Sequence, residues 1–572
     1  MPKVRLRLVA ALIALSLSLI AITRFSHAQR NAIDTYAITN ARIVPVSGPV
    51  IERGAILIRN GLISAVGANV SAPADARVID GNGLTIYPGL IDSYTSLGLP
   101  EAAPSPSPGG AGGFFQTVTR QPGASPGGAP NSTQPVGLQP EVMVEDLIKP
   151  GGAEIESAQN VGITTALTVP RTGIWTGQSA LIDLAGDTPQ QMIVRSPVAM
   201  HVGFTPLRGT YPNSLMGVFA SLRQMLLDAG RYRDSLQIYD RAPRGTRRPE
   251  TNRSLAALIP VLEGRMPVVM YADREREIDR ALDLAEEFKL HAIIAGGRES
   301  ARLADRLVRQ NVPVLLSLNL PRRTTAALPE ADPEPLRILR ERVEAQETAG
   351  KLARAHVRFA FQSGSLTNIS DFLLNAGRTI QNGLSAEDAL RALTIWPAEI
   401  LGAANQLGTL ETGKIANLTV MRGDLFDRNS RVALVFIDGR PIDLKPVTAA
   451  SQARGTASGT WTLNVNLGQG DIASTLNLQQ EGERLRGSIQ GLLGTGEISN
   501  AAVSAMGEVR FTISVTVEGQ TREAAFAGTI SGNEIRGTVA IEGRSPGSFT
   551  ATRPAPSASP SPTPSPSPTP GR

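Results

Sequence analysis

The 572-residue chain contains no cysteine, only four histidines and few aromatic residues. Without cysteine it can form neither disulfide bonds nor a lipid-modified thiol anchor, so the fold must be stabilised by packing alone. The histidines, His27, His201, His291 and His356, are far apart in the sequence. A histidine-based metal site would therefore require distant single residues to converge in the folded protein.

Positive charge is concentrated at the start of the chain. The formal net charge is +5, but Lys3, Arg5, Arg7 and Arg24 lie within residues 1–28 beside no acidic residue, so removing these four charges leaves +1. A nearly neutral remainder gives no electrostatic basis for binding nucleic acid or an anionic membrane surface. We expect neither as a partner.

Residues 1–28 have the features of a secretory signal peptide. Basic residues precede an apolar run from Leu8 to Ile22, and Ser26-His27-Ala28 forms a small-x-small cleavage site. The run, about 15 residues long, is short for a membrane span. We therefore expect an exported protein, periplasmic or extracellular, with no membrane span after cleavage. An uncleaved anchor is the alternative.

Hydrophobic periodicity divides the rest of the chain into α/β and all-β parts. Short alternating strands broken by turns occupy 36–86, with Asn60-Gly61 as a hairpin signal, and β character returns at 408–444. Between them, apolar strands alternate with amphipathic helices over 154–401, which is typical of parallel βα units. One helix is expected at 386–393, because Ser385 and Asp388 have capping-box spacing. Two β segments flanking one βα array indicate a domain built from both chain ends. Residues 459–552 are purely β and predict a barrel or sandwich. In this part, Trp461, Leu463, Val465 and Leu467 alternate as in a strand, and Ser531-Gly532-Asn533 predicts a hairpin turn.

Three segments have compositions that predict little packing. The stretch of about 100–139, rich in Gly, Pro and Ser, is expected to be a flexible insertion. The Pro/Ser repeat at 554–572 is expected to be a disordered tail. The arginine-rich segment 203–253 is interpreted as a solvated, partly mobile face.

The stretch Pro88-Gly89-Leu90-Ile91-Asp92-Ser93-Tyr94-Thr95-Ser96 is the most informative motif. It resembles the end of the first barrel strand in the imidazolonepropionase-like branch of the amidohydrolase superfamily, where two histidines stand in place of Tyr94 and Ser96. Residues two apart on a strand point to the same side and can share one ion. The resemblance extends over 36–444 and includes Gly162–Thr165, Gly383–Leu390 and Leu407–Leu418.

The resemblance implies the α/β fold class, with a (β/α)₈ TIM-type barrel, a composite β-sandwich from both chain ends and a separate C-terminal all-β domain. The expected boundaries are 29–87 and 404–447 for the sandwich, 88–403 for the barrel and 459–553 for the C-terminal domain. In such barrels the active site lies at the carboxyl ends of the strands.

The resemblance also implies a divalent metal centre, but each assignable ligand position holds another residue. Besides Tyr94 and Ser96, the family's ligands fall at Tyr271, at or beside Gly296, and at Gly364, which follows Ser363. Glycine supplies no ligand, and tyrosine must ionise before it can replace a neutral imidazole. We expect no tight binuclear zinc site and no cofactor; zinc or another divalent metal would bind only in a rebuilt site.

Two groups of residues are candidates for function. Asp92, Tyr94, Ser96, Tyr271, Gly296 and Gly364 are expected to form a pocket at the former ligand positions. The alternative for Tyr94, Ser96 and Tyr271 is that they only fill the vacated space, and for Asp92 that its buried carboxylate bonds backbone or hydroxyl partners. Asp273, Glu299 and His201 are the catalytic candidates. Their alternatives are acids at helix starts for the first two and a satisfied core histidine for the third.

These observations favour an exported amidohydrolase-family protein with a degenerate metal site, which binds a small polar molecule or serves as a partner subunit. A competing hypothesis is an active hydrolase of non-peptide C–N bonds, such as those of cyclic amides, acting through a rebuilt site. A third is a structural envelope protein. A protein partner or self-association is compatible with the first and third.

Overall fold

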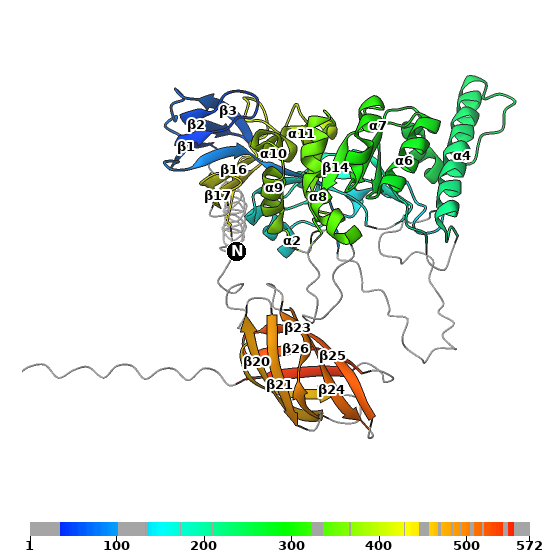
Figure 1. Ribbon diagram of the computed structural model, residues 1–572. Coiled ribbons are helices and arrows are strands. Elements are labelled where there is room, and N and C mark those ends of the chain that lie inside the picture. The colour runs from blue at the N-terminus through cyan, green and yellow to red at the C-terminus, as the bar shows by residue number, and fades with distance from the viewer. Residues whose placement is uncertain are drawn as a thin grey trace, which may run out of the picture. The chain divides into compact units, whose positions relative to one another are not determined.

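The computed structural model describes residues 35–100, 132, 134–171, 173–207, 211–321, 336–364, 366, 368–427, 430–444, 457–466, 471–481, 484–491, 494–503, 508–517, 520–541 and 547–553. Those between 35 and 444 form one compact unit, and those from 457 onwards form a second (Figure 1). The signal peptide expected at 1–28 and the tail expected at 554–572 lie outside the described residues. Export stays a prediction.

One sheet of the first unit draws strands from both of its ends. Its members are β1 (Thr35–Ile43), β2 (Ile51–Arg59), β3 (Leu62–Gly67), β4 (Arg77–Asp80), β5 (Thr85–Pro88), β16 (Leu418–Arg422), β17 (Arg431–Ile437) and β18 (Arg440–Ile442). The order is β18-β17-β16-β5-β1-β2-β3, with β4 paired to β1. Figure 1 shows blue β1–β3 close to β16 and β17. Asn60 and Gly61, both with positive φ, join β2 to β3 and confirm the predicted hairpin.

Parallel strands form the centre of the first unit. They are β6 (Leu90–Thr95), β7 (Ile163–Thr168), β11 (Met200–Gly203), β12 (Val268–Ala272), β13 (Ala292–Gly296), β14 (Val314–Ser317) and β15 (Phe359–Gln362). β6 pairs with β7, and β11 to β15 pair in sequence order. The Ser93 hydroxyl on β6 donates to the carbonyl of Phe361 on β15 at 2.7 Å.

An antiparallel segment lies between these two sets of parallel strands. β8 (Trp175–Gln178) pairs with β11, and β9 (Ala180–Asp183) pairs with β7, with only Ser179 between them. β10 (Ile193–Arg195) pairs with β9. The chain is therefore α/β with a β-rich part, which is the coarse fold class predicted from sequence.

Helices follow most of the parallel strands. They are α2 (Ala153–Asn160), α3 (Pro189–Met192), α4 (Leu215–Arg241), α5 (Arg253–Leu262), α6 (Glu275–Phe288), α7 (Ala304–Arg309), α8 (Leu336–Arg354), α9 (Asp371–Gln381), α10 (Ala386–Leu393) and α11 (Ile395–Ile400). α10 begins as predicted, because the Ser385 hydroxyl accepts the N–H of Asp388 at 2.9 Å. In the described part of the chain, no helix has the length and apolarity needed to cross a membrane.

Strand side chains alternate between two apolar cores. On β12, Val268 and Met270 pack into the larger core, which includes side chains of the helices, whereas Val269 packs into a second core with Ile293 and Leu315. All five side chains are at most 4% exposed. Burying each contributes about 1.5–3 kcal/mol relative to leaving it in water, so this alternation fixes which residues point inward.

The expectations for two weakly packed segments are wrong in part. Within 203–253, α4 is a 27-residue helix capped by the Ser214 hydroxyl, and Val218, Leu222 and Met225 are buried. Because the segment is rich in arginine, it was interpreted as solvated, although its apolar residues recur at the i and i+4 spacing of an amphipathic helix. The insertion expected at 100–139 lies mostly outside the described residues, but Leu138 and Gln139 are buried. Its last residues therefore pack against the unit.

The second unit is one antiparallel sheet. Its strands are β19 (Gly459–Asn466), β20 (Asp471–Glu481), β21 (Arg484–Gly491), β22 (Gly494–Glu497), β23 (Ser499–Val503), β24 (Glu508–Val517), β25 (Gln520–Ser531), β26 (Glu534–Ile541) and β27 (Gly547–Thr552). The order is β20-β19-β27-β26-β25-β24-β23-β21-β22, and an additional β20–β21 pairing joins the two ends. Ser531 pairs with Glu534, which confirms the hairpin predicted at Ser531-Gly532-Asn533.

Aromatic side chains fill the core of this sheet. Trp461, Leu463 and Val465 are fully buried, as their alternation predicted, whereas Leu467 lies outside the described residues. The Phe511 and Phe526 rings stack with centroids 4.8 Å apart. The Arg553 guanidinium lies 4.5 Å from the Trp461 ring centroid, so a cation from the last strand end covers an aromatic ring of the first strand.

A buried carboxyl connects the strands of the first unit with its composite sheet. Asp183, at the end of β9, accepts hydrogen bonds from the Thr165 hydroxyl at 2.8 Å and from the Asn417 side-chain amide at 2.7 Å. Asn417 precedes β16, and its own oxygen accepts the N–H of Asp438 at 2.8 Å. Burial raises the pKa of Asp183 to about 7, so the neutral acid is the form favoured by folding.

The raised pKa of Asp183 predicts that the free energy of unfolding depends on pH. As pH rises from 3.8 to about 7, the carboxyl ionises in the unfolded chain but not in the folded one. Its contribution to the free energy of unfolding is therefore lost over this window, by at most about 1.4 kcal/mol per pH unit. In Asp183→Asn, which keeps an oxygen acceptor, stability relative to the wild type should increase over this window and level off above it.

Urea denaturation from about pH 4 to about pH 8 measures this difference. The control is Asp187→Asn, because Asp187 is exposed and its replacement should leave the profile unchanged. A difference between Asp183→Asn and the wild type that is constant with pH would contradict the prediction.

Candidate active site

A cavity of about 790 Å³ lies at the carboxyl ends of the parallel strands. Its wall includes Tyr94 from β6, Gly203 from β11 and Tyr271 from β12. The residues that follow strands make up most of the rest: Pro170, Arg171, Gly173, Phe204, Thr205, Pro206, Leu207, Asp273, Arg274, Glu277, Arg298, Glu299 and Gly364, with Thr176, Val202, Leu215 and Glu341. This is the end of the strands where βα folds place their active sites.

Aromatic rings occupy the cavity wall at the end of β6. The Tyr94 ring centroid lies 5.8 Å from that of Tyr271 and 5.7 Å from that of His201. Burial, with the neighbouring Tyr271 phenol, raises the pKa of Tyr94 above its usual value. The Tyr94 hydroxyl therefore stays protonated at neutral pH, where it can hydrogen-bond a ligand but cannot act as an anionic metal ligand.

His201 lies behind the wall rather than in it. Its side chain is 2% exposed, and neither ring nitrogen has a hydrogen-bond partner among the described residues. Burial lowers the pKa of His201 to about 3, so the ring is neutral near pH 7. The ring packs against Tyr94, which lies in the cavity wall while His201 does not.

Asp273 follows β12 and lies in the wall. Its Oδ2 atom is 3.4 Å from the Tyr271 hydroxyl, which donates to it, and 3.7 Å from Arg298 Nη2. Burial raises the pKa of Asp273, and the Arg298 guanidinium opposes this more weakly. Its other oxygen, Oδ1, is buried without a partner among the described residues. A side chain added at Gly296 would place Cβ 2.7 Å from this oxygen.

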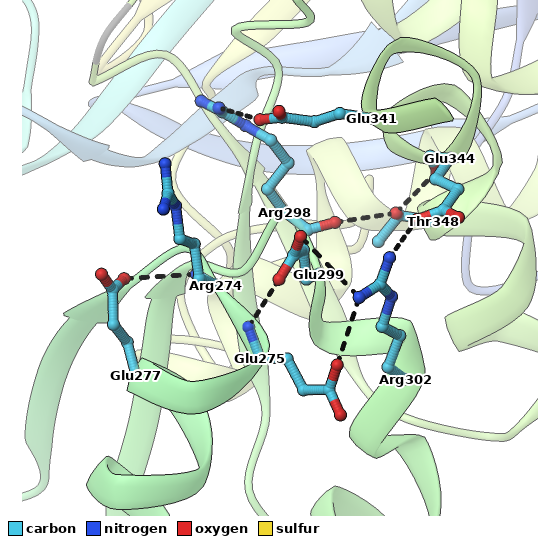
Figure 2. Close-up of polar contacts among 9 residues, drawn as sticks. All are labelled: Arg274, Glu275, Glu277, Arg298, Glu299, Arg302, Glu341, Glu344 and Thr348. Atoms are coloured by element: carbon cyan, nitrogen blue, oxygen red, sulfur yellow. Dashed lines mark hydrogen bonds and ion pairs between the residues drawn. The ribbon is translucent and has the colours of Figure 1, made fainter. Parts of the chain in front are cut away.

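Glu299 belongs to an ion-pair network at the edge of the cavity (Figure 2). Its Oε2 atom accepts the backbone N–H of Glu275 at 2.8 Å, and Oε1 lies 3.9 Å from Arg302. Arg302 also pairs with Glu344 on α8 at 2.7 Å, and Arg298 pairs with Glu341 at 3.2 Å. The carboxylate of Glu299 therefore has a structural role at the start of α6.

Asp92 and Ser96 do not reach the cavity. Asp92 is fully buried and accepts the backbone N–H of Ser363 at 2.9 Å, while the other carboxylate oxygen accepts the Ser363 hydroxyl. Burial raises the pKa of Asp92 to about 6, against the opposing effect of these hydrogen bonds. Ser96 accepts the N–H of Leu99 through its carbonyl. Asp92 thus joins β6 to the residue after β15, whereas Ser96 closes a turn in the chain that follows β6.

The structure thus brings some of the candidate residues together and separates others. Tyr94, Tyr271, Gly364, Asp273 and Glu299 share the wall, whereas Asp92, Ser96, Gly296 and His201 are not part of it. Sequence reasoning missed Arg171, Arg274, Arg298, Glu277 and Glu341 in the wall. The first three directly follow or nearly follow strand ends, and this position could have identified them.

At two positions a glycine lies in close contact with a larger neighbouring residue. A Cβ atom at Gly364 would lie 2.9 Å from Cδ1 and from the carbonyl oxygen of Tyr94, and at the same distance from the Gln362 side-chain oxygen. Gly296, at φ +90°, lies against Asp273 in the same way. The Tyr94 ring and the Asp273 carboxylate therefore occupy the space that side chains at 364 and 296 would need.

Comparisons with known proteins give the family. Residues 348–442 match the sequence model of the amidohydrolase family. The crystal structure of an amidohydrolase from Thermotoga maritima MSB8 matches 71% of this chain and 99% of its own length, with a TM-score of 0.59 and 26% identity. The chain belongs to the amidohydrolase superfamily. This membership fits a hydrolase-like protein and does not by itself establish activity.

Curated relatives match over short segments. Dihydroorotases from Pelobacter propionicus and Geobacter sulfurreducens are 33% and 40% identical over 63 and 60 residues. The matched segments span 15% and 14% of those enzymes, and 11% and 10% of this chain. Such coverage does not transfer their activity to this chain.

The residues of this amidohydrolase-fold chain do not fit the divalent metal on which the superfamily usually depends. In the described parts of the chain, no cluster of three or more His, Cys, Asp or Glu side chains could hold a metal ion. At the positions that the resemblance assigns to ligands, the cavity presents the protonated phenol of Tyr94, the side chain of Tyr271 and Gly364. These are poor donors for a zinc ion, which is bound by thiolate, imidazole or carboxylate.

The contact between Gly364 and Tyr94 predicts a coupled pair. Gly364→Ala should lower the free energy of unfolding by about 1–3 kcal/mol, because the added carbon overlaps the Tyr94 ring. In a Tyr94→Ala background the same change should cost less by about 0.5 kcal/mol or more, since one of the three close contacts is removed. Urea denaturation of the four proteins gives the coupling energy.

Gly48→Ala is the matched control, because no atom lies within 4 Å of a Cβ built at Gly48. It should be nearly neutral in both backgrounds. Equal costs of Gly364→Ala with and without Tyr94 would show that the ring does not occupy the space assigned to it.

Proposed function

We propose that this chain is a binding protein of the amidohydrolase superfamily, which holds a small polar molecule in its cavity without a metal ion. The proposal rests on the packing of Tyr94 beside Gly364 and of Asp273 beside Gly296. Loss of ligands alone would leave a hole, but here neighbouring side chains fill the space. The cavity at the strand ends persists beside them.

The proposal includes a specific architecture. It treats the parallel strands as one (β/α)₈-type barrel, in which the segment 175–183 takes the third position and the Ser93–Phe361 hydrogen bond joins β6 to β15. The second unit is taken as a separate all-β domain with its own aromatic core. Both assignments agree with the observed strand pairings.

The side chains of the cavity favour binding over hydrolysis. Metal-dependent hydrolysis needs a bound water that is deprotonated near neutral pH. The Tyr94 phenol has a raised pKa and the imidazole of His201 has a lowered one, so neither supplies a charge for such a step. Glu299 is committed to the backbone of Glu275. Phenol hydroxyls and arginines are suited to hydrogen-bonding a ligand.

A second candidate function is a rebuilt hydrolase, which Asp273 favours. One of its oxygens has no partner among the described residues, its pKa is raised, and the Tyr271 hydroxyl lies 3.4 Å from the other oxygen. A carboxyl in this state could move a proton for an attacking water. His201 does not take part in this arrangement, because it lies outside the cavity wall.

Ligand-detected NMR with and without EDTA distinguishes the two functions. The probes are hydantoin, dihydrouracil, N-acetyl-L-tyrosine and N-acetyl-L-tyrosinamide. We expect saturation transfer to at least one probe, equal with and without EDTA, and no hydrolysis product. Thr205→Trp should abolish the signal, because Thr205 is an exposed residue in the cavity wall, whereas Thr205→Val should retain it.

Two results would contradict the proposal. If products form and Asp273→Asn abolishes them, the rebuilt hydrolase is correct. If no probe binds, or if the signal survives Thr205→Trp, the cavity is not the binding site for this class of molecule.

A further inference from the structure

We propose that the cavity recognises a small organic carboxylate through Arg171 and Arg274. The inference rests on the proposed binding function and names the class of its ligand. The two arginines come from separate elements, since Arg171 lies three residues beyond β7 and Arg274 two residues beyond β12, and both lie in the cavity wall.

Each acidic residue of the wall contacts a partner through at least one oxygen, although Oδ1 of Asp273 has none among the described residues. Glu277 accepts the backbone N–H groups of Asp273 and Arg274, each at 3.2 Å, and Glu299 accepts that of Glu275. Glu341 pairs with Arg298, which also lies 3.7 Å from Asp273. Of the three arginines in the wall, Arg298 is therefore neutralised by carboxylates.

Arg171 and Arg274 differ from Arg298. Both are exposed, and neither guanidinium has a hydrogen-bond or ion-pair partner among the described residues. Figure 2 shows the Arg274 guanidinium extending away from Glu277, whose hydrogen bond with Arg274 is to the backbone N–H. Two cations without a carboxylate partner among the described residues thus border one cavity. A guanidinium presents a planar fork of donors that matches a carboxylate in two parallel hydrogen bonds.

The rest of the wall indicates what the carboxylate is attached to. Phe204, Leu207 and Leu215 line the cavity as an apolar group, and the Phe204 ring stacks on Phe219. Tyr94 and Tyr271 add aromatic faces with hydroxyl groups. A monoanion with an aromatic or other apolar body, and with a polar group for the phenols, fits both parts of the wall.

The charge of the wall also favours a monoanion over a phosphate. Four carboxyl residues, Asp273, Glu277, Glu299 and Glu341, share the cavity with the arginines. Their repulsion grows with the charge of the ligand, so it penalises a phosphate dianion more than a carboxylate. A carboxylate gains the charge-assisted hydrogen bonds of the two free arginines at the lower electrostatic cost.

Calorimetric titration with N-acetyl-L-tyrosine and N-acetyl-L-tyrosinamide tests the inference, because the two probes differ in the carboxylate alone. We expect the carboxylate to bind the wild type about tenfold or more tightly than the amide. Added salt should weaken the binding of the carboxylate and leave that of the amide unchanged.

Substitutions locate the effect. Arg171→Gln and Arg274→Gln should each reduce the preference for the carboxylate, and the double variant should abolish it without weakening the amide. Arg274→Lys should keep part of the preference, because it retains the charge and loses the planar fork. Arg53→Gln is the control, since Arg53 is an exposed residue of β2 outside the cavity wall.

Each remaining outcome decides a specific point. If both probes bind equally, the inference is overturned while the binding function stands; if neither binds, both fail. Competition by inorganic phosphate as strong as that by the carboxylate would overturn the choice of ligand class. A preference that survives in the double variant would overturn the assignment to these arginines. The comparison of the two probes uses the wild-type protein alone, so it does not depend on whether any variant folds.

Discussion

The close packing of Tyr94 against Gly364, together with that of Asp273 against Gly296, is the constraint on which the account of this protein depends. Protein interiors are filled to the density of organic crystals, so a residue cannot gain a side chain where a neighbour already occupies the space. The first contact lies between the ends of β6 and β15, and the second between the ends of β12 and β13. Both are beside the cavity. In the function proposed for this chain, these contacts leave no room for side chains at 364 and 296, two of the positions that the resemblance assigns to metal ligands.

Several further features follow from this packing. The Tyr94 ring packs beside His201, and burial keeps that imidazole neutral, while burial also raises the pKa of Asp92 beside Ser363. Burial therefore controls the protonation of both groups. The charged residues lie towards the cavity, where acids are paired and two arginines are free to meet a ligand.

Sequence patterns predicted local structure better than they predicted the site. The Asn60-Gly61 turn, the Ser385 cap and the alternation at Trp461 were readable because short-range chemistry determines them. The antiparallel segment 175–183 and helix α4 were missed, since the first depends on pairing with distant strands and the second was concealed by arginine. The proximity of Gly296 to Asp273 could not be predicted, because it arises from the loop geometry after two strands.

The most direct test of the central claim is the metal content of the mature chain after dialysis against zinc and manganese, measured by inductively coupled plasma mass spectrometry. If Tyr94 and Asp273 fill the space of the superfamily's metal centre, metal should be far below one ion per chain and should not affect the melting temperature. Near-stoichiometric metal that raises the melting temperature would contradict the account and show that the chain has rebuilt a metal site.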